Sequence, residues 1–68
     1  MEETYKERLV KESNELMEKI KKLQDFLESD KSAGINPTQL KLLEIQIRTM
    51  RTYSYVLHLR LEFLDVSI

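Results

Sequence analysis

The sequence predicts an all-α protein in which residues 1–68 form one domain, an antiparallel two-helix hairpin that assembles into a compact homo-oligomeric helical bundle. Three observations support this prediction. The single Gly and the single Pro both lie near the middle of the 68-residue chain. On either side of them, apolar residues recur every three or four positions, which is the spacing of a helical face. The second half has two such apolar stripes, whereas one partner helix covers only one.

The first helix is expected over residues 3–28, where helix-forming residues dominate and no Gly or Pro interrupts. One face follows the alternating four-three spacing of a coiled-coil seam: Leu9, Ser13, Leu16, Ile20, Leu23 and Leu27. The opposite face is charged, with Glu7–Lys11 and Glu18–Lys22 as acid-before-base pairs four positions apart, each worth about 0.3 kcal/mol. The helix therefore presents one face to a partner and one to solvent.

The connection is expected over residues 29–36 and contains Gly34, the residue that adopts a positive φ most freely. The following Asn36-Pro37-Thr38-Gln39 predicts the start of the second helix, over residues 37–64. Asn is a good N-cap, Pro suits the first helical position, and Gln39 can return a hydrogen bond to the cap. A short connection between two long helices favours an antiparallel hairpin.

The second helix is too apolar for a helix that has one partner. One stripe, with only Ser54 interrupting, consists of Leu40, Leu43, Ile47, Met50, Leu57, Leu61 and Leu64. The other consists of Leu42, Ile45, Tyr53, Val56, Leu59 and Phe63. Domains below roughly 70 residues usually need disulfides, a metal or oligomerisation. Because the chain has no Cys and one His, we expect self-association, with the functional sites in clefts between subunits.

The composition also limits the classes of function. The formal net charge is −1, so the overall charge does not favour binding to DNA or RNA. The charged N-terminal residues lack the apolar core of a signal peptide, and no apolar run approaches the ~20 residues of a membrane span. The lone His58 has no paired acid nearby, and a glycine-rich phosphate loop is impossible with one Gly. We therefore expect no enzyme, no catalytic residue, no metal site and no cofactor.

One candidate anion-binding cluster lies on the second helix. Arg48, Arg51, Tyr55 and His58 are spaced by three and four positions and therefore share a face. Arginine suits bidentate contacts with phosphate, and tyrosine offers a ring for stacking against a base. The alternative interpretation is a solvated polar edge with Arg–Glu pairs to the first helix.

A second candidate cluster, Lys19, Lys21 and Lys22, lies on the first helix. Tyr5 and Lys6 lie near the other end of that helix, and Tyr5 is about 24 Å from Lys21 along the axis. These two groups of residues can therefore contact one small ligand only if they come from different subunits. The alternative is that the lysines merely keep the helix soluble.

Two blocks of the chain follow a specific pattern. One is Leu42-Leu43-x-x-Gln46-x-x-x-Met50-Arg51-x-Tyr53-x-x-x-Leu57-x-x-Arg60-Leu61. The other is Tyr5-Lys6-Glu7-Arg8-Leu9, followed by Glu15-Leu16-x-x-x-Ile20-x-x-Leu23-x-x-Phe26-Leu27-Glu28. Together they resemble the phage anti-CBASS and anti-Thoeris sponge family, whose members are small helical hairpins. The resemblance extends over nearly the whole chain.

This resemblance implies a viral protein that binds and sequesters cyclic dinucleotides or trinucleotides, or cyclic ADP-ribose variants, without cleaving them. Such a protein blocks bacterial antiphage signalling from the cytoplasm of the infected host, commonly as a hexamer. The resemblance implies a dinucleotide site, shared by two subunits, that uses Tyr5 and either Lys21 or Lys22. It also implies a trinucleotide site with Arg51 as the best match and Arg48 next. Lys6, beside Tyr5, completes the set of candidate ligand-binding residues.

A different class of function stays open on the sequence alone. The chain could be a structural or adaptor coiled-coil hairpin that binds a partner helix through its second apolar stripe. A small nucleic-acid binder is a third possibility, which the acidic balance of the chain opposes. We therefore expect small cyclic oligonucleotides and further copies of the chain as partners, and neither a DNA or RNA polymer nor a membrane.

Overall fold

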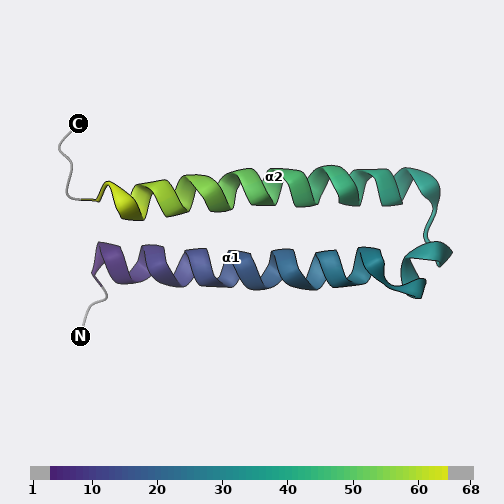
Figure 1. Ribbon diagram of the computed structural model, residues 1–68, viewed down its shortest axis with the longest axis horizontal. Helices are drawn as coiled ribbons and strands as arrows, with labels where there is room; N and C mark the ends of the chain where they lie inside the picture. The colour runs from purple at the N-terminus through teal and green to yellow at the C-terminus, as the bar shows by residue number, and fades with distance from the viewer. Residues whose placement is uncertain (1–3, 65–68) are drawn as a thin grey trace.

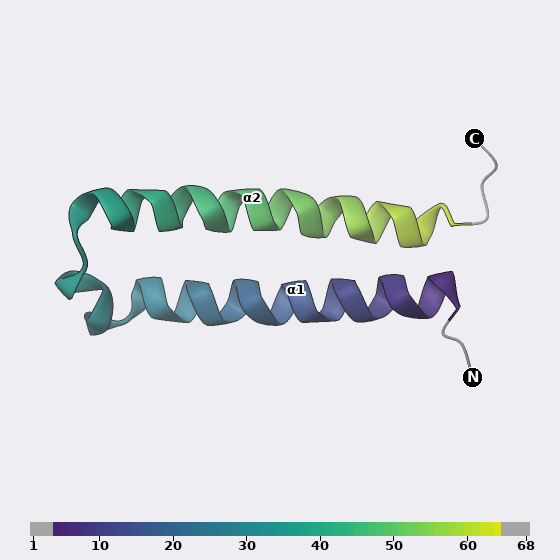
Figure 2. The same cartoon turned by 180° about the vertical axis from the view of Figure 1, so that it is seen from behind.

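The computed structural model describes residues 4–64, which form an antiparallel helical hairpin (Figure 1). Its elements are the helix α1 (Tyr5–Glu28), the 3₁₀ helix η1 (Asp30–Gly34) and the helix α2 (Pro37–Glu62). The start of α1 and the end of α2 lie at one end of the hairpin, and η1 lies at the other (Figures 1 and 2). The described residues contain no strand. The predicted all-α hairpin is confirmed.

The helix α1 begins at Tyr5 because Thr4 caps it. The Thr4 side chain accepts a hydrogen bond of 3.1 Å from the backbone N–H of Glu7. Such a cap satisfies a donor that has no partner within the helix, and it stabilises the helix by about 1 kcal/mol. The helix thus begins at Tyr5, two residues after the start that we predicted at Glu3. Glu3 itself lies outside the described residues.

The connection closes the C-terminal end of α1 with serine hydroxyls. Ser29 Oγ donates to the carbonyl of Phe26 at 2.7 Å, and Ser32 Oγ shares its proton between the carbonyls of Ser29 at 2.8 Å and Leu27 at 3.1 Å. The last carbonyls of a helix have no N–H partner within the helix, and these bonds give them a hydroxyl partner. No described residue has a positive φ, so the conformational freedom of Gly34 is not used. Serine side chains thus perform the role that glycine often has at the end of a helix.

The start of α2 is as predicted from its cap. The Asn36 side chain accepts a hydrogen bond of 2.8 Å from the backbone N–H of Thr38, and proline takes the first helical position. Gln39 does not return a bond to the cap within the described residues, so that part of the prediction is wrong. The helix ends at Glu62, two residues before the predicted end at Leu64.

The seam between the helices consists of the predicted residues. Leu9, Ser13, Ile47 and Leu57 are buried, and Leu57 is 0% exposed. The other members are half-buried: Leu16, Ile20, Leu23 and Leu27 in α1, Leu40, Leu43, Met50 and Leu61 in α2, and Leu64 just beyond its end. No buried side-chain polar atom among the described residues lacks a hydrogen-bond partner. The first apolar stripe of α2 therefore faces α1.

The second apolar stripe of α2 faces away from α1. Five of its six members are between 42% and 55% exposed: Leu42, Ile45, Tyr53, Val56 and Phe63. Leu59 is half-buried. Large apolar side chains that line up along one exposed face commonly mark an interaction surface. The packing of the two helices in one hairpin thus covers only one of the two stripes of α2.

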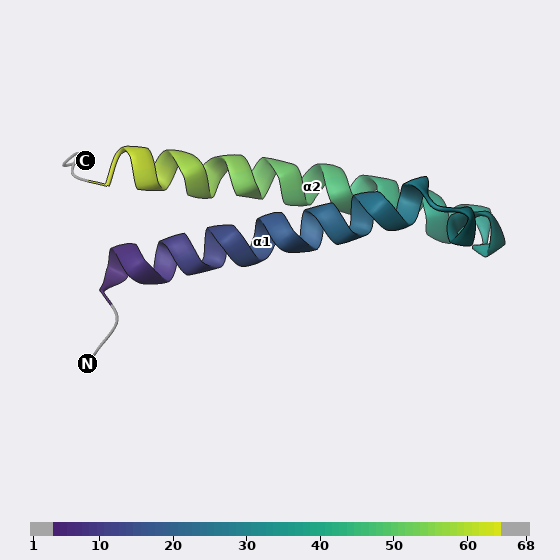
Figure 3. The same ribbon diagram turned by 60° about the horizontal axis from the view of Figure 1, so that its bottom comes forward.

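The overall shape explains why so little is buried. The two helices form a single layer, with extents of 47 × 28 × 14 Å, and Figure 3 shows that their axes are inclined to each other. Two helices have one line of contact, so every side chain away from that line stays in solvent. No helix in the described part of the chain combines the length and the apolar character needed to cross a membrane.

Candidate functional site

Two polar grooves lie between α1 and α2. The first, here called the Arg51 groove, has a volume of about 270 Å³ and is lined by Met17, Ile20, Lys21, Gln24, Arg51 and Ser54. The second, here called the Arg60 groove, has a volume of about 250 Å³ and is lined by Tyr5, Arg8, Leu9, Glu12 and Arg60. Glu12 and Gln24 are about a third of a turn apart around α1. The seam residues lie between them, so the grooves flank the seam on two sides.

The Arg51 groove is held together by a hydrogen bond between the helices. Arg51 Nη2 donates to Gln24 Oε1 at 2.9 Å. The Gln24 amide nitrogen in turn donates to Glu28 Oε1 at 3.4 Å, one turn further along α1. Lys21 lies one turn before Gln24 and lines the same groove. Two cationic residues from different helices therefore meet at one place.

The lining of the Arg51 groove is positively charged. No acidic residue lines it, and within residues 4–64 neither Arg51 nor Lys21 has a carboxylate partner. Met17 and Ile20 supply apolar surface beside the two cations. Guanidinium and ammonium groups suit phosphate oxygens, and apolar surface suits the flat face of a base. This chemistry matches an anionic ligand that also has an apolar part.

The Arg51 groove is smaller and more open than a typical small-molecule site. Sites for small molecules usually enclose about 300–1,000 Å³ and bury most of the ligand. The groove offers about 270 Å³, and Met17 at its edge is 57% exposed. The groove is thus open to solvent on one side and does not enclose a ligand.

The Arg60 groove is organised differently. Arg60 Nη2 donates to the Tyr5 hydroxyl, and its guanidinium carbon lies 5.8 Å from the centroid of the Tyr5 ring, within the range of a cation–π contact. The Tyr53 hydroxyl donates to Glu12 Oε1. Two tyrosines thus connect α1 to α2 near the open end of the hairpin.

These contacts shift two pKa values. The hydrogen bond to the Glu12 carboxylate raises the pKa of Tyr53 above its usual 10.0, and burial adds to the effect. The hydrogen bond to Tyr5 raises the pKa of Arg60. Both shifts favour the protonation states in which the contacts form. At neutral pH, neutral Tyr53 donates to Glu12 and cationic Arg60 donates to Tyr5.

The predicted site residues fall into three groups. Lys21 and Arg51 line one groove together, and the structure thereby distinguishes Lys21 from Lys22, which the sequence did not. Tyr5 lines the other groove, where its hydroxyl accepts from Arg60. The remaining three are exposed and line neither groove: Lys6, Lys22 and Arg48.

Sequence reasoning missed the partners of these residues. We expected Arg–Glu pairs as the alternative role of the polar edge of the second helix, whereas Arg51 contacts Gln24, a neutral amide. Gln24 follows Lys21 by three positions, and this spacing was the one signal that it shares the lysine's face. The pair of Tyr53 and Glu12 gave no signal in the sequence. The two residues are 41 positions apart, and their contact depends on how the helices pack.

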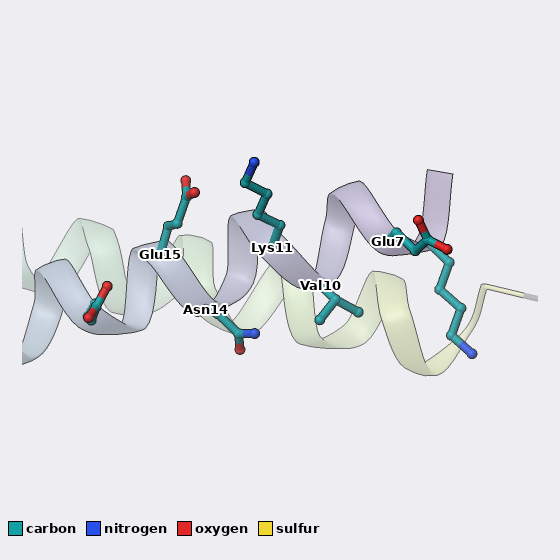
Figure 4. Close-up of a pocket in the computed structure, with 7 residues that line it drawn as sticks. Glu7, Val10, Lys11, Asn14 and Glu15 are labelled. Carbon is teal, nitrogen blue, oxygen red and sulfur yellow. The ribbon is translucent and has the colours of Figure 1, made fainter. Parts of the chain in front are cut away.

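A wider hollow of about 700 Å³ runs along α1 alone, and Figure 4 shows five of its residues on that helix. Its lining consists of Lys6, Glu7, Val10, Lys11, Asn14, Glu15 and Glu18. One helix cannot enclose a ligand, and three carboxylates against two ammonium groups disfavour an anion. Volume alone therefore does not make this hollow the site. No described group of three or more His, Cys, Asp or Glu residues is arranged to hold a metal ion.

Comparison with known proteins places the chain in a family. A family model described as Sequestin matches residues 3–63, a range that contains both helices and both grooves. Neither a curated protein nor a solved structure matches the chain. The name of the family is consistent with a protein that sequesters its ligand. The chain belongs to the Sequestin family.

Proposed function

We propose that this protein sequesters cyclic oligonucleotide second messengers: cyclic dinucleotides or trinucleotides, or cyclic ADP-ribose variants. The observation that best supports the proposal is the Arg51 groove, where Lys21 and Arg51 meet beside apolar surface with no acid in the lining. Such a ligand has at least two phosphate groups and at least one flat base. Its binding therefore needs cations and apolar or aromatic surface in one place.

We propose binding without cleavage. The lining of the Arg51 groove contains no carboxylate, His or Cys. Proton transfer near neutral pH most often uses His or a carboxylate, so the groove lacks the usual general acids and bases. Its cations and amide are suited to holding a phosphate. We therefore assign no catalytic residue.

The exposed stripe of α2 supports the proposal that the protein works as a homo-oligomer, and the resemblance to the sponge family makes a hexamer the preferred stoichiometry. A second hairpin packed on this stripe would cover side chains that are now about half exposed. Closing the open side of the Arg51 groove would take a further subunit, because Arg51 lies on a different face of α2 from this stripe. Sequestration at nanomolar concentration needs about −12 kcal/mol, which an enclosed site provides more readily than an open helix face.

The biological setting follows from the same proposal. A phage that encodes such a protein would lower the free concentration of messenger in the cytoplasm of its infected host. The defence effectors of the bacterium would then stay inactive. The resemblance to the anti-CBASS and anti-Thoeris sponges supports this setting, and the family match is consistent with it.

The proposal is tested by melting the purified protein in the presence of a panel of cyclic di- and trinucleotides and cyclic ADP-ribose. A ligand at 100 times its Kd should add about 2.7 kcal/mol to the free energy of unfolding. The bound ligand is then released by denaturation and identified by mass spectrometry. Intact ligand supports sequestration. Degraded ligand, or no melting shift with any member of the panel, contradicts it.

One observation favours a second function. The exposed stripe of α2 is also what an adaptor hairpin would use to bind a partner helix. Sedimentation separates the two functions, because an adaptor that waits for its partner stays a folded monomer at micromolar concentration. The sponge that we propose self-associates under those conditions.

A further inference from the structure

We infer that Gln24 is a positioning residue, which fixes the Arg51 side chain in its groove while leaving the guanidinium charge available to an anion. The inference rests on the proposed function, because it assumes that the anion is the phosphate of a cyclic oligonucleotide. It assigns a role to a residue that contributes no charge of its own.

The orientation of the Gln24 amide supports this role. Its nitrogen donates to Glu28 Oε1 at 3.4 Å, and its oxygen accepts from Arg51 Nη2 at 2.9 Å. The Glu28 carboxylate can only accept hydrogen bonds, so it selects the orientation in which the amide oxygen faces α2. Gln24 is half-buried, whereas Arg51 and Glu28 are exposed. The more buried residue thus holds the more exposed one.

The neutral charge of Gln24 is the second argument. A carboxylate at this position would pair with the guanidinium through two hydrogen bonds and cancel its charge. A phosphate would then compete with that carboxylate for Arg51. The amide oxygen takes one of the five N–H donors of the guanidinium and leaves the others for the ligand. Holding the side chain in advance also reduces the entropy that binding must remove.

An exchange of two side chains tests the inference. The double variant Gln24→Glu/Glu28→Gln has the net charge of the wild type but places the carboxylate against Arg51. We expect it to bind cyclic trinucleotide, the ligand class expected for Arg51, at least tenfold more weakly and with a shallower dependence of Kd on salt, because one ion contact is lost. Equal affinity and an equal salt dependence would overturn the inference. Circular dichroism confirms that the variant is helical.

Two single variants separate charge from position. Gln24→Leu removes the acceptor without adding a charge, and we expect a three- to tenfold weaker affinity with helicity retained. Asp25→Asn removes a carboxylate that is exposed and lines neither groove, so its affinity should stay within twofold of the wild type. If Gln24→Leu binds as tightly as Asp25→Asn, Gln24 does not position Arg51.

A measurement without ligand distinguishes failure of the inference from failure of the proposed function. The ¹⁵Nε heteronuclear NOE reports how ordered each arginine side chain is on the nanosecond timescale. Arg51 should be more ordered than Arg48, which has no side-chain partner among residues 4–64, and Gln24→Leu should remove the difference. Equal disorder in the wild type overturns the role of Gln24, whether or not a cyclic oligonucleotide binds. Absence of binding with an ordered Arg51 refutes the proposed function instead.

Discussion

The two grooves beside the seam use the same type of cation in opposite ways. In the Arg51 groove, a guanidinium rests on a neutral amide, a lysine lies nearby, and no acid lines the walls. In the Arg60 groove, a guanidinium rests on a tyrosine, and Glu12 shares the lining. Under the proposed function, the first arrangement leaves positive charge for a ligand, whereas Arg60 is engaged by Tyr5 within the protein. We propose that the partner of each arginine separates a ligand-binding role from a structural one.

The grooves also differ in position. The Arg60 groove includes Tyr5 and Arg8 in the first turn of α1. This is the end of the hairpin where no connecting segment holds the two helices together. The Arg51 groove lies further along α1, between Met17 and Gln24, where the helices already pack through the seam. A contact that holds the two helices together is therefore more important in the Arg60 groove. Four predictions test this division of roles.

The largest effect should come from the seam that separates the grooves. Leu57 is 0% exposed, and Leu57→Ala should lower the free energy of unfolding by about 2–5 kcal/mol through lost burial and a cavity. Urea denaturation measures this change, with Val10→Ala, at 39% exposure and outside the second stripe, as the control. A loss below about 1 kcal/mol for Leu57→Ala would show that the seam is not the core.

The next effect compares the two arginines directly. Arg51→Ala should weaken the binding of a cyclic oligonucleotide by about 10- to 100-fold, because a hydrogen bond to a charged group is worth about 1.5–3 kcal/mol. Arg60→Ala should leave the affinity within about threefold and instead lower the melting temperature. Isothermal titration and thermal melting give both quantities. The reverse outcome, with affinity lost in Arg60→Ala alone, would exchange the roles of the grooves.

A smaller difference should separate two neighbouring lysines. Lys21 lines the Arg51 groove and Lys22 lines neither groove. Lys21→Ala should weaken binding by about two- to fivefold, because an exposed ion pair contributes up to about 1 kcal/mol. Lys22→Ala should have no effect beyond twofold. Equal losses in both variants would mean that the ligand contacts a broader face of α1 than this groove.

The smallest effect concerns pH and the Arg60 groove. The hydrogen bond to Glu12 raises the pKa of Tyr53 above 10.0 in the folded protein, so the folded state retains the phenolic proton more strongly than the unfolded state. This contribution to stability is complete below pH 10.0 and is lost as pH rises through the folded pKa. Chemical denaturation between pH 9 and 11 should show the decrease, and Tyr53→Phe should reduce it. An equal slope in both proteins would show that the Glu12–Tyr53 bond does not form in solution.

The sequence by itself determined the local structure. The Asn36 cap, the seam of α1 and the two stripes of α2 depend on residues that lie within four positions of one another, and the structure agrees with each of them. Arg51 and Lys21 were also recognisable as candidates, because their chemistry is visible without any fold.

Only the tertiary structure decided which polar residues meet. Arg51 contacts Gln24 across 27 residues, and Arg60 contacts Tyr5 across 55. These pairs depend on how far one helix is shifted and rotated against the other, which follows from seam packing and from the path of the connection. Helical periodicity gives the face on which a residue lies but not its partner on the next helix. That is the physical reason why the cations could be predicted and their opposite roles could not.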